Sequence, residues 1–253
     1  MIETRKLTKS FGSTVAVKDL DLVVEPGEIL GFLGPNGAGK STTVKILTGM
    51  LQPTSGSAWV AGYDVVMAPL EVKKRLGFVP ESGALYETLT GGEYLEMVAN
   101  LHFMDMDKAL RKIADLLDLF GILDARDRRL SEYSKGMKQK VLITAALMHN
   151  PEVLFFDEPF NGIDANAAMV VKELLRELAA KGKTILFCSH ILEVVERICT
   201  RIVIIDKGRE IANGTAAEIV ARTGASSLEE AFSDLTGVRD SSEVTRDFLA
   251  ALE

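Results

Sequence analysis

One octapeptide, Gly34-Pro35-Asn36-Gly37-Ala38-Gly39-Lys40-Ser41, constrains this chain more than any other feature. It matches the pattern G-x-x-x-x-G-K-[ST] at every fixed position, and Thr42 follows it directly. The apolar segment Glu28 to Leu33 before it reads as a strand, and a helix is predicted from Gly39 to about Thr48. Glycines between a strand and a helix let backbone N–H groups and the helix N-terminus face phosphate oxygens. The octapeptide therefore predicts a nucleotide site.

Two side chains of this loop have predicted roles. Lys40 is expected to reach the β- and γ-phosphates, and the Ser41 hydroxyl to bind Mg²⁺. The ordinary alternative is a glycine turn before a helix. Kinases, GTPases and motor proteins share the loop, so it does not by itself select a class of enzyme.

The rest of the chain predicts an α/β fold in three parts. The first third reads as short strands, among them Ile2 to Leu7 and Val15 to Val24. Residues from about 82 to 150 read as helices, with Thr90 and Asp107 as helix caps and Ser134 opening a third helix. Strands then alternate with helices again, which indicates a parallel sheet with right-handed crossovers.

Charge and composition exclude several classes of protein. The 29 Lys and Arg residues against 36 Asp and Glu residues give a net charge of −7, so we expect no nucleic-acid partner. The longest apolar runs are far shorter than the ~20 residues that span a bilayer. Met1 to Ser10 is charged, so we expect no signal peptide and a cytoplasmic location. Two cysteines, Cys188 and Cys199, cannot form a disulfide framework.

A pair of carboxylates ends a second apolar strand. Asp157 and Glu158 follow Val153 to Phe156, and ligands bind at the carboxyl edge of such sheets. Adjacent residues of a strand face opposite ways, so the two carboxylates are expected to differ in role. Asp157 suits Mg²⁺, and Glu158 suits the water that attacks the γ-phosphate. The alternative is a strand that simply ends in a polar turn.

The three histidines differ in their predicted surroundings. His102 is expected to face solvent. His149 precedes Asn150-Pro151 at a helix end where a cation is favourable, so we expect it to have a structural role. His190 follows the predicted strand Thr184 to Cys188 at the same sheet edge as the carboxylates. It could donate to the γ-phosphate or to the attacking water, although its position alone does not decide this.

Ser134 lies 23 residues before Asp157 and can cap a helix, with Gly136 allowing close approach to an anion. A helix N-terminus without a phosphate loop of its own is a second candidate phosphate site. Its ordinary interpretation is a capped helix.

In combination these motifs resemble the ATP-binding cassette (ABC) ATPases, the nucleotide-binding subunits of ABC transporters. The resemblance covers about residues 2–215. Gly34 to Ser41 resembles the Walker A loop and Val153 to Glu158 the Walker B strand. Ser134 to Met137 falls at the signature, Asn161 to Asp164 at the D-loop, and His190 at the switch histidine.

The resemblance implies a fold and a set of roles. The fold is a P-loop NTPase core with a mainly parallel sheet, an N-terminal antiparallel β subdomain and a helical lobe inserted at about 82–150. The domains would be residues 1–215 and a helical tail, 216–253. Phe11 would stack on adenine beside Ala16. Glu158, His190 and Lys40 would be catalytic, and Ser134, Lys135, Gly136 and Met137 would contact the ATP held by another subunit.

Three departures from the family pattern stand out. The signature reads Tyr133-Ser134-Lys135-Gly136-Met137 where Leu-Ser-Gly-Gly-Gln is usual. Glu81 replaces the glutamine that links Mg²⁺ to the transporter interface, and Phe11 replaces a tyrosine. Similar variants occur in the branch of drug, lipid and ion exporters with separate membrane subunits, so the resemblance favours export.

We therefore expect an ATPase with ATP and Mg²⁺ as cofactors. Its partners would be a second copy or a homologous subunit and a polytopic permease, which would hold it at the cytoplasmic face of the membrane. The alternatives are a soluble mechanoenzyme of the same superfamily and a switch that binds ATP without turnover. Beyond Gly214, one apolar helical face favours a packing role for the tail; it comprises Leu228, Ala231, Phe232 and Leu235. The cargo is not predicted.

Overall fold

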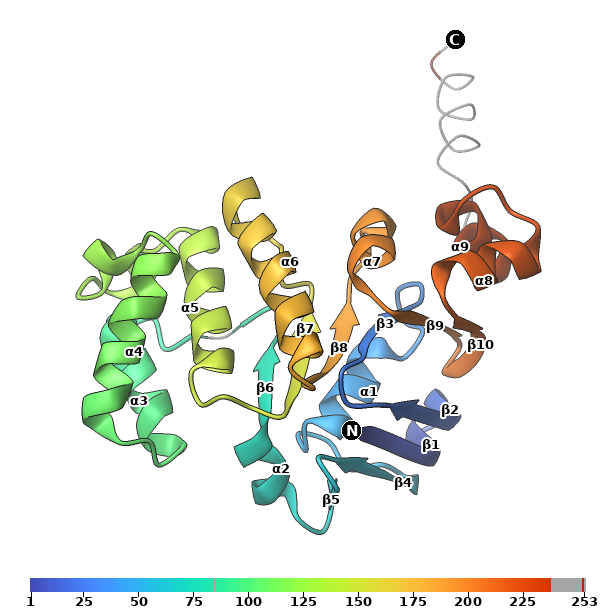
Figure 1. Ribbon diagram of the computed structural model, residues 1–253. Coiled ribbons are helices and arrows are strands. Elements are labelled where there is room, and N and C mark those ends of the chain that lie inside the picture. The colour runs from blue at the N-terminus through green and yellow to red at the C-terminus, as the bar shows by residue number, and fades with distance from the viewer. Residues whose placement is uncertain (84, 238–251, 253) are drawn as a thin grey trace.

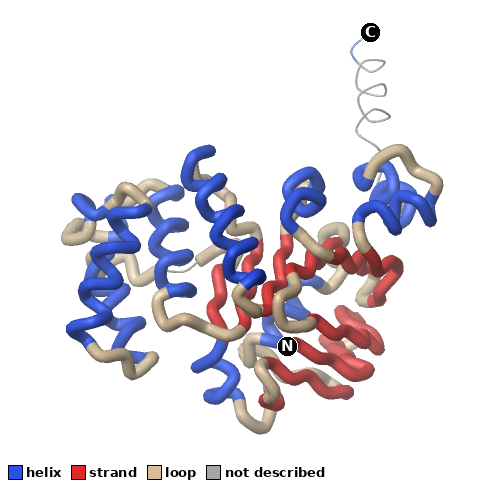
Figure 2. Tube along the Cα trace, viewed as in Figure 1, coloured by secondary structure: helices blue, strands red, loops and turns tan. Residues whose placement is uncertain are grey.

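The computed structural model describes residues 1–83, 85–237 and 252. It contains two sheets and a group of helices at one end (Figures 1 and 2). The N-terminal sheet is antiparallel, in the order β2-β1-β4-β5. Its strands are β1 (Ile2–Phe11), β2 (Thr14–Val24), β4 (Ser55–Val60) and β5 (Tyr63–Asp64).

The second sheet has the order β10-β9-β3-β8-β7-β6, and all neighbours are parallel except β10 with β9. Its strands are β3 (Ile29–Leu33), β6 (Leu76–Val79), β7 (Val153–Asp157), β8 (Thr184–Cys188), β9 (Arg201–Asp206) and β10 (Arg209–Gly214). Every residue of β3, β7 and β8 is buried, as the continuous apolar runs predict for strands covered on both faces. A turn at Lys207-Gly208 joins β9 to β10.

The expected α/β class, with an antiparallel N-terminal sheet and a mainly parallel core, is confirmed. The helices beside these sheets are α1 (Lys40–Leu47), α2 (Pro69–Arg75), α6 (Ala165–Ala180), α7 (Leu192–Ile198), α8 (Ala216–Thr223) and α9 (Leu228–Thr236). The exact domain boundaries stay a prediction, and residues 238–251 and 253 of the proposed tail lie outside the described residues.

The helical lobe interrupts the chain between β6 and β7, which are nevertheless paired neighbours. It comprises α3 (Gly91–Leu101), α4 (Met106–Leu119) and α5 (Lys135–Leu147), with the 3₁₀ turns Leu123–Ala125 and Leu130–Glu132. In Figure 1 the three helices stand together at the end opposite α8 and α9. Thr90 forms the predicted capping box. Asp105, not the predicted Asp107, caps α4, because its side chain accepts the Lys108 amide and Asp107 lies within the first turn.

Candidate functional site

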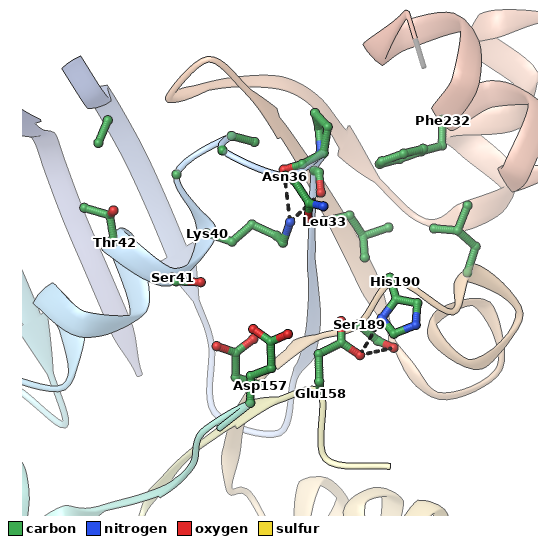
Figure 3. Close-up of a pocket in the computed structure, with 18 residues that line it drawn as sticks. Leu33, Asn36, Lys40, Ser41, Thr42, Asp157, Glu158, Ser189, His190 and Phe232 are labelled. Atoms are coloured by element: carbon green, nitrogen blue, oxygen red, sulfur yellow. Dashed lines mark hydrogen bonds and ion pairs between the residues drawn. The ribbon is translucent and has the colours of Figure 1, made fainter. Parts of the chain in front are cut away.

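A cavity of about 860 Å³ opens at the carboxyl ends of β3, β7 and β8 (Figure 3). The loop from Gly34 to Thr42 forms one wall. The remaining lining residues are Ala16, Leu33, Glu81, Asp157, Glu158, Ser189, His190, Leu192 and Phe232. The structure thus brings together the phosphate loop, the two strand-end carboxylates and the predicted switch histidine.

Glycine is required in the phosphate loop because backbone passes close to it. A Cβ on Gly39 would lie 2.3 Å from the carbonyl oxygen of Ala16, and the φ of Gly39 is 109°. A Cβ on Gly34 would lie equally close to the carbonyl oxygen of Ile205. The loop is therefore packed against β2 and β9 at positions where a side chain cannot fit, which fixes the start of α1.

Lys40 bridges its own loop. Its Nζ donates to the carbonyl oxygens of Gly34, at 2.5 Å, and Pro35, at 3.2 Å. The ammonium group is thus held at the centre of the loop, where the backbone N–H groups and the N-terminus of α1 also favour an anion. The predicted contact of Lys40 with the β- and γ-phosphates is consistent with this placement and stays a prediction.

Asp157 and Glu158 line the same cavity, although strand geometry alone predicts that they face opposite ways. Asp157 is the last residue of β7, and Glu158 has a φ of 51° in the left-handed region. This uncommon backbone conformation breaks the alternation of the strand. In Figure 3 Asp157 lies toward Ser41 and Glu158 toward His190.

Glu158 is held by the residues that follow β8. Its Oε2 accepts the Ser189 hydroxyl at 3.2 Å and lies 2.9 Å from His190 Nδ1, while its amide donates to the Cys188 carbonyl oxygen at 3.0 Å. Glu158 and Ser189 are buried, whereas the side chain of His190 is 70% exposed. The buried Ser189 hydroxyl thus positions the Glu158 carboxylate. The exposed His190 imidazole contacts the same carboxylate and has room to move.

Asp157 lies in negatively charged surroundings. Burial, followed by the charges of Glu81 and Glu158, raises its pKa to about 6, against the lowering effect of Lys40 and Lys45. The ionised carboxylate is therefore unfavourable in the nucleotide-free protein. A cation placed beside it would relieve this cost.

The oxygen atoms at this place suit Mg²⁺ bound together with phosphates. The Ser41 hydroxyl and the carboxylates of Glu81 and Asp157 line one cavity. No group of three or more His, Cys, Asp or Glu side chains in the described part of the chain is arranged to hold a metal ion unaided. Mg²⁺ is commonly bound by one or two carboxylates with substrate phosphates and water, which fits this donor set.

Several predicted site residues lie outside the cavity. Ala16 and Thr42 line it, but Phe11 does not. Phe11 is 51% exposed, and Lys9 Nζ lies 5.1 Å from the centre of its ring. The four signature residues and Asp164 are also absent from its walls. The cavity of one chain therefore contains the predicted phosphate and water positions but not the predicted signature contacts.

The signature turn and the D-loop form one packed unit. Ser134 caps α5, and a Cβ on Gly136 would lie 2.4 Å from the carbonyl oxygen of Gly162. Asp164 caps α6 and forms an ion pair with Lys140 at 2.8 Å, and these contacts lower the pKa of Asp164 to about 2. Gly136 is thus required for packing inside the chain.

Two of the departures within the signature, Lys135 and Met137, differ in their surroundings. Lys135 is exposed, and its stem passes close to Gly162, within 3 Å of a Cβ built there. Met137 is half-buried against the core of the helical lobe. Its apolar side chain therefore serves packing at a position where the family usually has glutamine.

The prediction for His102 was wrong, whereas His149 has the expected structural role but not as a cation. His102 is half-buried rather than solvent-facing, and its ring stacks on His149 with centroids 3.7 Å apart. Burial, followed by the charge of His102, lowers the pKa of His149 to about 4. His149 Nε2 contacts the Leu76 carbonyl oxygen at 2.9 Å. His149 is therefore neutral at pH 7 and does not supply a cation at this helix end.

Sequence reasoning missed four residues of the cavity, which are Leu33, Ser189, Leu192 and Phe232. Ser189 could have been found, because it lies between the last residue of β8 and His190 at the same sheet edge. Phe232 was placed on an apolar helical face, and nothing in the sequence indicates that α9 returns to the phosphate loop.

Comparison with known proteins identifies the family. The sequence model described as "ABC transporter" matches residues 17–161. The chain is 40% identical to the daunorubicin/doxorubicin resistance ATP-binding protein DrrA of Streptomyces peucetius, over 90% of this chain and 69% of DrrA. It is 36% identical to the linearmycin resistance ATP-binding protein LnrL of Bacillus subtilis, over 90% of this chain and 73% of LnrL.

A solved structure agrees with these relatives. A structure of an ATP-binding subunit of an ABC transporter superposes with a TM-score of 0.88 at 34% identity, covering 93% of this chain and 99% of the other. Fold and site together define a P-loop ATPase. The chain belongs to the ABC transporter family, as an ATP-hydrolysing nucleotide-binding subunit.

The raised pKa of Asp157 predicts a stability change that depends on pH. An acid whose pKa rises from 3.8 to about 6 on folding destabilises the fold as pH rises through that interval. Asp157→Asn should therefore raise the Tm of the nucleotide-free protein at pH 7.5 by about 2–4 °C, which corresponds to ~1 kcal/mol after discounting for partial exposure. The gain should shrink between pH 6 and pH 4.

Thermal unfolding followed by circular dichroism at pH 7.5 and pH 4.5 measures this. Glu81→Gln should produce a smaller gain of the same sign, because it removes one charge that raises the pKa of Asp157. Asp164→Asn is the contrasting control and should lower the Tm at pH 7.5, because the pKa of Asp164 is depressed in the folded protein. A loss of stability at pH 7.5 in Asp157→Asn would contradict this account of the charge.

Proposed function

We propose that two nucleotide-binding subunits close head to tail around two ATP molecules and power export through a separate membrane permease. The observation that supports this most is the single cavity in which the phosphate loop faces Glu158, Ser189 and His190. A carboxylate beside a phosphate-binding loop is the arrangement that water attack on the γ-phosphate requires.

In this proposal ATP enters with its phosphates along the loop from Gly34 to Thr42. Lys40 leaves the carbonyl oxygens of Gly34 and Pro35 for the phosphates, where its charge is better compensated. Glu158 orients the attacking water while Ser189 keeps the carboxylate in place. His190 leaves Glu158 and donates to the γ-phosphate, which frees the carboxylate for water.

Mg²⁺ would be held by Ser41 and Asp157, with Glu81 as a further ligand directly or through water. When bound it would neutralise charge that develops on the phosphate oxygens. Glu81 brings a negative charge in place of an amide, which adds to the attraction for a divalent ion. The raised pKa of Asp157, caused by burial and then by Glu81 and Glu158, supports this assignment.

The second subunit would complete the site from outside. Ser134 and Lys135 are exposed at the N-terminus of α5, away from the cavity of their own chain, and so are available to another molecule. The helix N-terminus favours an anion, and Lys135 adds a cation beside it. The packing of Gly136 on Gly162 would move the signature and the D-loop together during closure. Phe11 would stack on adenine through its exposed ring.

Export is favoured by the relatives, whose names describe resistance to daunorubicin, doxorubicin and linearmycin. Among the described residues no helix is long and apolar enough to cross a membrane. The relatives are named as ATP-binding proteins, and we propose that the membrane path belongs to another polypeptide, which would hold this subunit at the cytoplasmic face. The segment after Glu81, where Tyr86 is 63% exposed, is the proposed contact with this other polypeptide.

The role of Glu158 predicts a separation of binding from turnover. Glu158→Gln keeps the size of the side chain and its acceptor for Ser189 but removes the charge that orients water. Turnover should fall by about 10²-fold or more, while ATP binding and ATP-induced association persist. Phosphate release, nucleotide binding and light scattering with size exclusion measure the three properties. Normal turnover in this variant would refute the assignment of Glu158.

The proposed membrane permease leads to a second prediction. Affinity purification of the tagged chain from detergent-solubilised membranes of its own organism, with and without ATP, should recover a polytopic membrane protein. Lys40→Ala, which weakens ATP binding, is the control for nucleotide-dependent recovery. Recovery of soluble partners alone, from a chain with intact ATPase activity, would favour the soluble mechanoenzyme instead.

A further inference from the structure

One polar side chain of the signature helix is buried against the turn that carries Glu158. Gln139 lies on α5 and is only 6% exposed. Its Nε2 donates to the carbonyl oxygen of Pro159 at 3.1 Å, and Pro159 follows Glu158 directly in the sequence. Neither Gln139 nor Pro159 lines the nucleotide cavity. This hydrogen bond therefore reaches the site only through the backbone beside Glu158.

The chemistry of Gln139 differs from that of the side chains around it. A buried amide is costly unless it is hydrogen-bonded. The buried residues that follow it on α5 include the apolar Val141, Leu142 and Ile143. A methionine would fill much the same space as the glutamine without a polar group to satisfy. The N–H donor, rather than the bulk of the side chain, is thus what Gln139 adds to this face of the helix.

The backbone polar groups of Glu158 and Pro159 all have partners. The amide of Glu158 donates to the Cys188 carbonyl oxygen at 3.0 Å, and its carbonyl oxygen accepts the Asn161 amide at 3.2 Å. Pro159 is buried and has no N–H, so its carbonyl oxygen is the remaining group, and it accepts from Gln139. The left-handed φ of 51° at Glu158 persists only where such surroundings hold it.

Two more contacts join the same face of α5 to the D-loop. Gly136, Gln139 and Lys140 are spaced i, i+3 and i+4, which places them on one face of the helix. Gly136 packs on the carbonyl oxygen of Gly162, and Lys140 forms its ion pair with Asp164. Of these three contacts, the one made by Gln139 reaches the residue next to the proposed water-orienting carboxylate.

We propose that Gln139 is a positioning residue for Glu158. By holding the Pro159 carbonyl oxygen it fixes the left-handed turn, so that the Glu158 carboxylate faces the cavity beside Ser189 and His190. Without the donor this buried carbonyl oxygen would be left unpaired, and the turn would relax toward conformations that satisfy it. The proposal rests on the role proposed above for Glu158. It adds to that role a residue of the signature helix that touches neither nucleotide nor water.

The competing explanation is that Gln139 contributes only to the packing and stability of α5. Gln139→Met keeps the length of the side chain and removes the donor. Thr144→Val is the matched control, because Thr144 is buried on the same helix and its hydroxyl donates to the carbonyl oxygen of Lys140, within α5. Both variants lose a buried hydrogen bond of α5, but only Gln139→Met leaves the turn at Glu158 without a contact.

Steady-state ATPase kinetics of the full chain provide the first test. Gln139→Met should lower kcat by about fivefold to fiftyfold and leave KM for ATP within about twofold, because a misplaced group affects the reaction more than substrate binding. Thr144→Val should stay within about twofold of the parent chain. If Gln139→Met fails to fold, Gln139→Glu, which has nearly the same shape and lacks the N–H donor, carries the same expectation. An unchanged kcat, or an equal loss in Thr144→Val, would overturn the proposal.

A double-variant cycle supplies a readout that a packing role does not share. Single-turnover hydrolysis measures the residual rates of Glu158→Gln and of the chain with both Glu158→Gln and Gln139→Met. These two rates should agree within about twofold, because an absent carboxylate cannot be misplaced. A further loss as large as that of Gln139→Met alone would establish a packing role instead. Full turnover in Glu158→Gln by itself would refute the proposed role of Glu158, which is a separate result.

Discussion

The parallel pairing of β3, β8 and β7 is the constraint on which the site depends. Asp157 pairs with Cys188 at the ends of β7 and β8, and β3 runs alongside β8 in the same direction. The residues that follow these strands therefore emerge at one edge of the sheet: the phosphate loop, Glu158, and Ser189 with His190. Burial of all three strands on both faces makes this register costly to change, since a shift would move apolar side chains out of the core.

Much of this arrangement is readable from the sequence because it depends on local signals. The glycine pattern, the buried runs and the carboxylates at a strand end each occupy a few consecutive residues. What the sequence does not predict depends on contacts between distant segments or on unusual backbone. The left-handed conformation of Glu158 turns it into the cavity beside Asp157, against strand alternation. Phe232 and the stacked pair of His102 and His149 depend on packing across the fold.

The departures from the family pattern have separate physical consequences. Met137 is accommodated by the core of the helical lobe, so this position can lose its polar side chain without leaving a gap. Glu81 adds negative charge to the nucleotide site, where it helps raise the pKa of Asp157. Lys135 lies exposed over the D-loop, where a cation can meet a phosphate of another subunit. The nucleotide site of one chain is thus rich in carboxylates, and the proposed contribution of the partner is positive.

The central claim is that this cavity is half of a site that a second chain completes. Disulfide cross-linking tests it directly, because Cys188 and Cys199 are largely buried and Asn36 and Lys135 are exposed. Chains carrying Asn36→Cys and chains carrying Lys135→Cys, both with Glu158→Gln, are mixed with Mg²⁺ and ATP and then oxidised. We predict a cross-link between the two chains that depends on ATP. Failure to form it, in a mixture shown to bind ATP, would contradict the head-to-tail site.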